Sequence, residues 1–199
     1  MSPAAPGSSG VRRPAAKLGE LSTVDVAAAL ASGPLDVVVP LGALVQHGPH
    51  LPLATDQIIA EAVAESVASS VGDCLITPAL PVGASSHHLS FAGTASLSDD
   101  LLARSQVEIV ESLLSHGFRS VYLVTGHAGN SGAMVAAADA LDERAVSFHD
   151  WPAQRAAIHE VAQTELGLHP DVVGTHAGHF ETSIMLLVRP DLVRLDRAE

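Results

Sequence analysis

Aromatic residues and cysteine are scarce in this chain, and it has no long hydrophobic run. Only 3% of its 199 residues are aromatic, so the core has to be built from Val, Leu, Ile and Ala. The single cysteine, Cys74, excludes an internal disulfide framework, and its place in the apolar stretch CLITPALP predicts a small buried hydrophobe. No apolar run approaches the roughly 18 residues of a membrane-spanning helix, so no membrane partner is expected.

Basic residues are also few. Ten Lys and Arg stand against 22 Asp and Glu, and the formal net charge is −12. Nucleic acid would be repelled on average, so it is not expected as a partner. Residues 1–17 lack the apolar core of a signal peptide and are predicted to be a flexible lead-in to a single domain at 18–199. The protein is therefore expected to be soluble and cytoplasmic.

Short apolar runs alternate with amphipathic segments along the chain, of which 47% is hydrophobic and 16% charged. This alternation predicts an α/β fold with a mostly parallel sheet covered by helices on both faces. The predicted strands are 37–41, 74–81, 120–126 and 145–151, and the predicted helices are 56–71, 99–117, 130–143 and 152–166.

Histidines follow the predicted strands. His47 comes after the first strand, His87 and His88 after the second, and His127 after the third. In parallel α/β folds, ligands bind outside the carboxyl ends of the strands. None of the 11 histidines precedes His47, which favours one convergent site.

The stretch QHGPHLPLATD (residues 46–56) sets His47 and Asp56 at the two ends of a loop stiffened by Gly and Pro. Imidazole nitrogens and carboxylate oxygens are ligands for a divalent metal. The residues alone leave two interpretations open, a metal site or a solvated loop in which Asp56 or Thr55 caps the next helix.

Two further stretches carry histidines beside glycines. LVTGHAGN (residues 123–130) predicts a tight turn with His127 at its tip, although it lacks the full phosphate-binding patterns. GTHAGHFETS contains His176, His179 and Glu181. Because His176 and Glu181 are five residues apart, a regular helix would not align them, whereas a loop entering a strand would. Histidines that simply face solvent remain the alternative for both stretches.

Together, PLGALVQHGPHLPLATD, GASSHHLSFAGTASL, HGFRSVYLVTGHAGN and THAGHFETSIMLLVRPDLV resemble the creatininase (creatinine amidohydrolase) family, in family order over about residues 36–195. HAGHFETS and LGEL resemble most the peptidases of mycofactocin maturation. The resemblance implies a creatininase-like three-layer α/β/α sandwich and a homo-oligomer. It also implies hydrolysis of an amide or cyclic amide bond with two divalent metals.

The resemblance also implies roles for individual residues. His47 and His127 match metal-binding histidines, and Asp56 matches the aspartate that bridges both metals. Creatininase has a glutamate two residues after the second of these histidines, where this chain has a glycine, and Glu181 is the candidate replacement. His176 and Glu181 are the catalytic candidates, with His176 passing a proton to the leaving nitrogen.

Four residues are candidates for contacts with a small-molecule or short-peptide substrate. His88 and His179 are expected to contact it through their side chains. Gly126 and Ala128 are expected to shape the oxyanion environment through the backbone.

The chain departs from the family pattern at Val45. The family usually reads Glu-Gln-His-Gly-Pro-His, and its Glu is a metal ligand. One hypothesis is a metal-dependent amidohydrolase or peptidase with one or two Zn, Fe or Mn ions per subunit, acting in maturation of a peptide-derived cofactor or natural product. The alternative is a degenerate relative that serves as a binding or partner subunit, or has altered chemistry. The retained His47, Asp56, His127 and Glu181 favour the first.

Overall fold

A five-stranded parallel sheet forms the centre of the computed structural model, which describes residues 16–141 and 143–198. The strand order is β1-β3-β2-β4-β5, and every pair of neighbours is parallel. The strands are β1 (Ala16–Lys17), β2 (Asp36–Leu41), β3 (Cys74–Ile76), β4 (Val121–Thr125) and β5 (Ala145–Ser147). This arrangement confirms the predicted α/β fold with a mostly parallel sheet.

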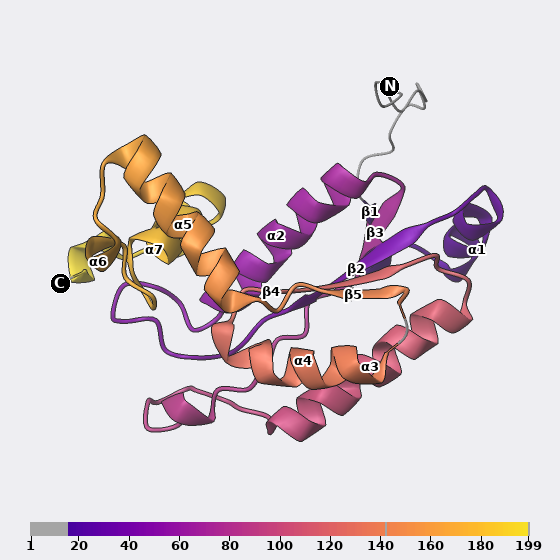
Figure 1. Cartoon of the computed structure of the whole chain (residues 1–199), viewed down its shortest axis with the longest axis horizontal. Coiled ribbons are helices and arrows are strands. Elements are labelled where there is room, and N and C mark those ends of the chain that lie inside the picture. The colour runs from indigo at the N-terminus through magenta and orange to yellow at the C-terminus, as the bar shows by residue number, and fades with distance from the viewer. Residues whose placement is uncertain (1–15, 142, 199) are drawn as a thin grey trace, which may run out of the picture.

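Helices cover both faces of the sheet, as Figure 1 shows. Helix α2 (Thr55–Val71) lies on one face, and α3 (Asp99–Ser115) and α4 (Ser131–Ala140) lie on the other. The remaining α-helices are α1 (Thr23–Ala31), α5 (Trp151–Leu166), α6 (Pro170–Val173) and α7 (His179–Val188). Short 3-10 turns occupy Leu18–Glu20, Ser86–His88, Ala128–Asn130, Pro190–Leu192 and Leu195–Arg197. Helices α5, α6 and α7 gather at the end of the molecule to which the loops after β2 and β4 lead.

Strand β2 is buried along its whole length, because helices cover it on both sides. Val37 and Val39 belong to the larger core cluster, together with residues of α3 and α4. Val38 points to the opposite face and packs with Ala64 and Ala68 of α2. The alternation is that of a strand, whose successive side chains point to opposite faces. The small alanines let α2 lie close to the sheet.

The start of α2 differs from the sequence-based expectation in a way that matters for the site. Neither Thr55 nor Asp56 caps the helix; the N-cap residue is Ala54, which makes no side-chain hydrogen bond there. Thr55 instead donates from Oγ1 to the carbonyl oxygen of Pro52, 2.7 Å away. The carboxylate of Asp56 is thus free for other partners.

The expected loop-to-strand transition after His176 is wrong. Residues 179–188 form helix α7, so Glu181 lies in the first turn of a helix. A short apolar run can belong to either a strand or a buried helix, and here packing against α2 selects the helix. Helix α7 ends before Pro190.

The predicted strand 74–81 is shorter than expected and ends at Ile76. Pro78 has no N–H to donate to a neighbouring strand, and only an isolated bridge between Leu80 and Leu41 follows. Cys74 is buried as expected, and desolvation raises the pKa of its thiol to about 12.

Most of the predicted lead-in, residues 1–15, lies outside the described residues, whereas Ala16–Lys17 form β1. Within the described part of the chain, no helix is long and apolar enough to cross a membrane.

Candidate metal centre

Four ionisable side chains from distant parts of the chain are buried together at the carboxyl ends of the strands. His47 follows β2, Asp56 lies in the first turn of α2, His127 follows β4, and Glu181 starts α7. Their exposed fractions are 0%, 1%, 5% and 8%, respectively. Burying an ionisable group costs free energy unless it is paired or coordinates a metal, so this cluster is the strongest candidate for a functional site.

Asp56 lies between the two histidines. Its Oδ1 is 3.0 Å from Nε2 of His47, and its Oδ2 is 2.8 Å from Nδ1 of His127. Burial alone would raise the pKa of Asp56, but its contacts with His127 and His47 outweigh burial, and the net shift is downward. The carboxylate therefore stays ionised, with one oxygen directed at each histidine.

The ring of His47 is held by the backbone. Its Nδ1 is 3.0 Å from the carbonyl oxygen of Val45, which can only accept, so Nδ1 carries the hydrogen. Its Nε2 then faces Asp56 and also lies 3.8 Å from Oε1 of Glu181. Burial lowers the pKa of His47, but the two carboxylates outweigh burial, and the net shift is upward. A positive charge at this position is thus favoured, whether it comes from a proton or from a metal ion.

The ring of His127 is also held by hydrogen bonds, in this case through Nε2. Its Nε2 lies 3.2 Å from both the Ala84 carbonyl oxygen and the Ser85 hydroxyl. A proton on Nε2 leaves Nδ1 as an acceptor facing Asp56. In this neutral form of the ring the two acceptors share no proton, and among the described residues the buried Oδ2 of Asp56 has no hydrogen-bond partner. This oxygen and Nδ1 are suited to bind a cation together.

Ser85, His127 and Asp56 have the connectivity of a Ser-His-Asp triad, yet the surroundings of Ser85 argue against that role. Ser85 has an exposed fraction of 0% and does not line the cavity beside the site. A nucleophile has to reach the substrate. The Ser85 hydroxyl therefore serves to fix the ring of His127.

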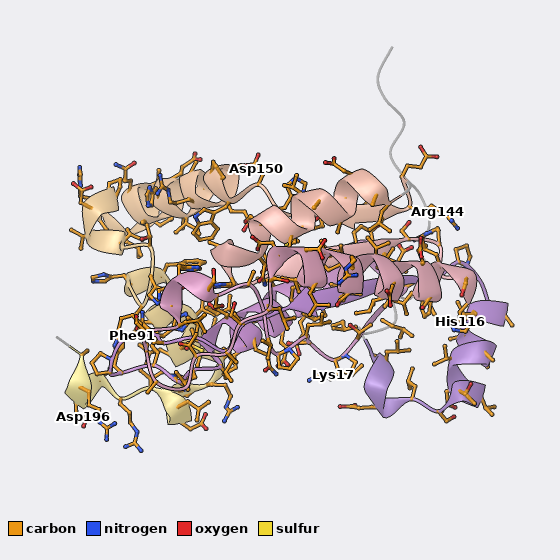
Figure 2. All side chains as sticks on the ribbon, turned by 90° about the horizontal axis from the view of Figure 1, so that it is seen from below. Lys17, Phe91, His116, Arg144, Asp150 and Asp196 are labelled. Atoms are coloured by element: carbon orange, nitrogen blue, oxygen red, sulfur yellow. The ribbon has the colours of Figure 1, made fainter. Side chains whose placement is uncertain are left out.

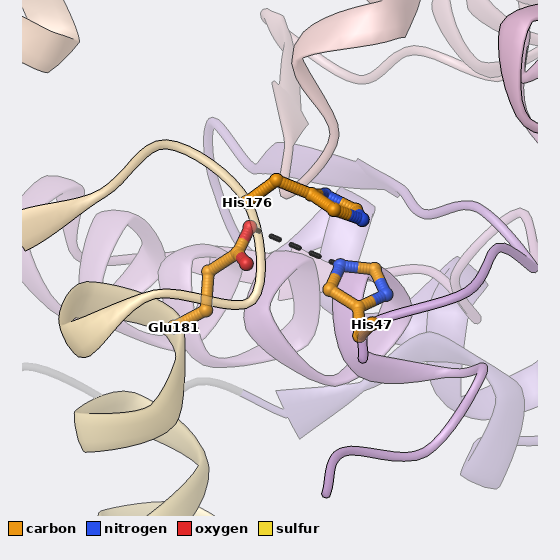
Figure 3. Close-up of side chains that lie close together, drawn as sticks. All are labelled: His47, His176 and Glu181. Carbon is orange, nitrogen blue, oxygen red and sulfur yellow. Dashed lines mark ion pairs between the residues drawn. The ribbon is translucent and has the colours of Figure 1, made fainter. Parts of the chain in front are cut away.

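A third histidine, His176, is partly buried beside this group, and Figure 3 shows it next to His47 and Glu181. The rings of His176 and His47 have their centroids 4.5 Å apart. Burial, together with the charge of His47, lowers the pKa of His176, so this ring is neutral near pH 7. Burial has the opposite effect on the carboxyl group of Glu181, whose pKa is raised.

Gln46 links two of the predicted site histidines, although sequence reasoning missed it. Its Nε2 lies 3.0 Å from Nε2 of His176 and 3.4 Å from Nδ1 of His88. Its Oε1 accepts from the N–H of Gly48 at 2.9 Å, and its backbone oxygen lies 2.7 Å from Nε2 of His176. The available signal was its place directly before His47 in the same loop.

The donor set fits a divalent metal. One ligand atom each from His47, His176 and Glu181 lies within 4.8 Å of the other two. Two ligand atoms that are each 2.0–2.2 Å from one ion lie roughly 3–4 Å apart. The distances from Nε2 of His47 to the nearest oxygens of Asp56 and Glu181 fall in this range. Imidazole and carboxylate donors suit Zn, Mn and Fe.

Glycines allow this close approach of backbone segments. A Cβ at Gly126 would overlap the backbone oxygen of Asp56 and lie 2.8 Å from the nitrogen of Ala60, so β4 and α2 could not meet as they do. A Cβ at Gly129 would overlap Nε2 of His127. The glutamate that creatininase has at this second position is thus incompatible with the ring position of His127, which leaves Glu181 as the nearby carboxylate.

A cavity of about 300 Å³ opens beside the buried group. Three predicted substrate contacts, His88, Gly126 and Ala128, line it, whereas the fourth, His179, is exposed and does not. Trp151, an aromatic residue that the sequence placed near the pocket, also lines this cavity, as do Arg155 and Thr175, which were not predicted. Its volume is at the lower end of the range of small-ligand sites.

Known proteins with the same fold and similar sequence fall into one family. The creatininase (creatinine amidohydrolase) family profile matches residues 19–199. A creatinine amidohydrolase of Pseudomonas putida is 35% identical in an alignment of 197 positions that covers 90% of this chain and 74% of that protein. A mycofactocin precursor peptide peptidase of Mycobacterium tuberculosis is 35% identical in an alignment of 189 positions. The alignment covers 90% of this chain and 68% of that protein.

Solved structures agree with this assignment. A creatininase with Mn has a TM-score of 0.77 and 31% identity, over 92% of this chain and 76% of that one. A zinc form of a creatininase mutant has a TM-score of 0.76 and 31% identity, with the same coverage. On the evidence of the parallel sheet, the buried histidine and carboxylate cluster and these matches, the chain belongs to the creatininase family.

Proposed function

We propose that this protein is a metal-dependent hydrolase that cleaves a C–N amide bond in a peptide or a cyclic amide. The observation that carries the proposal is Asp56, whose two oxygens face His47 on one side and His127 on the other. The similar proteins, a creatinine amidohydrolase and a mycofactocin precursor peptide peptidase, support hydrolysis of this type of bond. A role in maturing a peptide-derived cofactor or natural product is part of the proposal.

The geometry supports two unequal metal positions. His47, Oδ1 of Asp56 and Glu181 would hold one divalent ion, for which three protein ligands and a water suffice. Oδ2 of Asp56 and Nδ1 of His127 would hold a second ion more weakly, because the side chain of Val45 offers no donor atom. A divalent ion bound here polarises an amide carbonyl and lowers the pKa of water to about 7.

The remaining side chains bind the substrate and move protons. His176 is neutral near pH 7 and lines the cavity, so it can take up a proton and deliver it to the leaving nitrogen. Gln46 holds one nitrogen of that ring and leaves the other for the substrate. The backbone at Gly126 and Ala128 borders the cavity where the carbonyl oxygen of the substrate would lie.

The decisive experiment counts metal ions per subunit by elemental analysis, on protein purified without chelators or a metal-binding tag. We expect one or two ions in the wild type and almost none in Asp56→Ala. Asp100→Ala, which removes an exposed carboxylate on α3, should match the wild type. Absence of metal from the wild type after addition of Zn, Mn or Fe, or full metal content in Asp56→Ala, would contradict the proposal.

Activity is then screened on short peptides and cyclic amides with the same three proteins. Hydrolysis should follow metal content and be lost in Asp56→Ala. The homo-oligomeric state, the cytoplasmic location and the single domain at 18–199 stay predictions.

A further inference from the structure

One face of α5 forms a wall of the candidate site. Trp151, Arg155 and His159 are spaced four residues apart, so they lie on the same side of the helix. Trp151 and Arg155 line the cavity beside the metal centre, and all three line a narrower cleft that continues from it. The two glutamates of α5, Glu160 and Glu165, line neither space. Figure 2 labels Asp150, the residue before this helix.

Arg155 has no partner of its own. Among the described residues its side chain makes no ion pair, whereas Lys17, Arg104, Arg119 and Arg189 each contact a carboxylate. It is also the only Lys or Arg among the described residues that line the cavity. Arg155 is exposed, so its guanidinium is open to a negatively charged ligand at the edge of the cavity.

The chemistry of this group points to a carboxylate. A guanidinium presents its N–H donors in a planar fork that matches the two oxygens of a carboxylate. The amino-terminal end of α5 is less suited to hold an anion. The carboxylate of Asp150 already accepts from the N–H of Ala153 there, at 3.0 Å. The carboxylates of Asp56 and Glu181 would repel a negative substrate, but a divalent ion between them offsets their charge.

We propose that Arg155 binds a carboxylate group of the substrate. The substrate is then an amide whose scissile bond lies near a free carboxylate, as at the C-terminal end of a linear peptide. A neutral cyclic amide would leave Arg155 unused. This inference rests on the proposed hydrolytic function and adds a substrate class to it.

The test uses metal-loaded protein and three pools of N-acetylated hexapeptides. The first pool ends in a free carboxylate, and the second has the same sequences but ends in a carboxamide. The third ends in a carboxamide after a final Glu, which separates a side-chain carboxylate from a C-terminal one. Retained peptides and cleavage products are both quantified by mass spectrometry, so binding and hydrolysis are measured independently.

Wild-type protein should retain or cleave at least one carboxylate-bearing pool about tenfold better than the plain carboxamide pool. Arg155→Gln should abolish this preference, and Arg155→Lys should keep part of it because the positive charge remains. Arg104→Gln on α3 is the matched control and should behave like the wild type. Metal content should be equal in all four proteins, since none of these changes touches a proposed ligand.

The outcomes separate the two proposals. Cleavage without a carboxylate preference, or a preference that survives in Arg155→Gln, would overturn the role of Arg155 and leave the hydrolytic function standing. Retention that depends on Arg155, with no cleavage of any pool, would support the role of Arg155 and count against the hydrolytic function. If no pool is retained or cleaved, the role of Arg155 is overturned, and the hydrolytic function is then judged by the screen on cyclic amides.

Discussion

Val45 stands where the resemblance to the family implies a metal-binding glutamate, and in this protein it contributes through its backbone. Its carbonyl oxygen fixes the ring of His47, while its side chain is completely buried. In the proposed scheme, a valine here leaves the position of His47, Asp56 and Glu181 unchanged. It would deprive the position shared by Asp56 and His127 of a side-chain donor.

Restoring a carboxylate at this position should therefore strengthen metal binding. We expect Val45→Glu to raise metal content toward two ions per subunit. The metal-free variant should be less stable than wild type, because an unpaired buried carboxylate is costly. Elemental analysis and thermal unfolding with and without Zn or Mn measure both effects. Val45→Gln is the neutral control, and unchanged metal content in Val45→Glu would show that the added carboxylate does not reach the metal.

Gln46 is a positioning residue in this scheme, since its side chain touches His176 and His88 and makes no hydrogen bond with the proposed ligands His47, Asp56, His127 and Glu181. Gln46→Leu should lower kcat roughly 10–100-fold, the usual effect of losing a group that orients the site. Metal content and stability should change little. Gln163→Leu, at an exposed position of α5, is the control. A loss of metal in Gln46→Leu would instead assign this side chain to the metal centre.

At the scale of secondary-structure elements, an ion pair stabilises the end of the sheet opposite the candidate site. Arg119, just before β4, donates from Nε to Oδ1 of Asp36 at 2.8 Å and also contacts Oδ2 through its other nitrogen. Asp36 is completely buried at the start of β2, whereas the side chain of Arg119 is 52% exposed. This pair ties the amino ends of the two central strands together.

Removing the arginine should leave a buried carboxylate without its partner. We expect Arg119→Leu to lower the free energy of unfolding by about 2 kcal/mol, less than for a fully buried pair because water can reach the exposed side. Urea denaturation measures the change. Arg104→Leu breaks an exposed pair and should cost less than about 1 kcal/mol. Metal content per folded subunit should not change in either variant.

The elements themselves differ in how well they can be predicted. Helix α3 follows from its periodic apolar positions and from the serine before it, Ser98, whose hydroxyl accepts from the N–H of Leu101. Helix α7 was expected to be a strand because its apolar run is short and its partner, α2, is more than a hundred residues earlier. Local pattern alone does not distinguish the two.

At the scale of the whole molecule, the candidate site joins segments that are distant in the chain. The site brings together the loop after β2, the start of α2, the turn after β4 and the start of α7. A metal ion bound to all of them would stabilise the folded state, because the unfolded chain does not bring these donors together.

Removing the metal should thus destabilise the protein as a whole. At a free metal concentration 100 times the Kd, the loss is about 2.7 kcal/mol, or roughly 5–10 °C in Tm for a chain of this length. Thermal unfolding of wild type before and after chelation measures the shift. Asp56→Ala should show no shift on chelation. Equal Tm values for metal-loaded and metal-free wild type would argue against metal bridging of these segments.

The sequence by itself determined the alternation of apolar strands and amphipathic helices, and hence the parallel sheet. It also determined which residue types stand at the strand ends, because a strand of Val and Leu followed by Gly, Pro and His allows few other structures. These features depend on residues that are close in the chain. Motifs such as QHGPH and HAGHFETS could therefore be recognised as those of one family.

Only the tertiary structure decided which side chains meet. The two oxygens of Asp56 face different histidines, Gln46 reaches His176 across 130 residues of sequence, and Arg155 borders the cavity without a partner. Such contacts depend on how helices dock on the sheet, and no local pattern contains that information. The docking of α7 also leaves His179 exposed on the surface and buries Glu181.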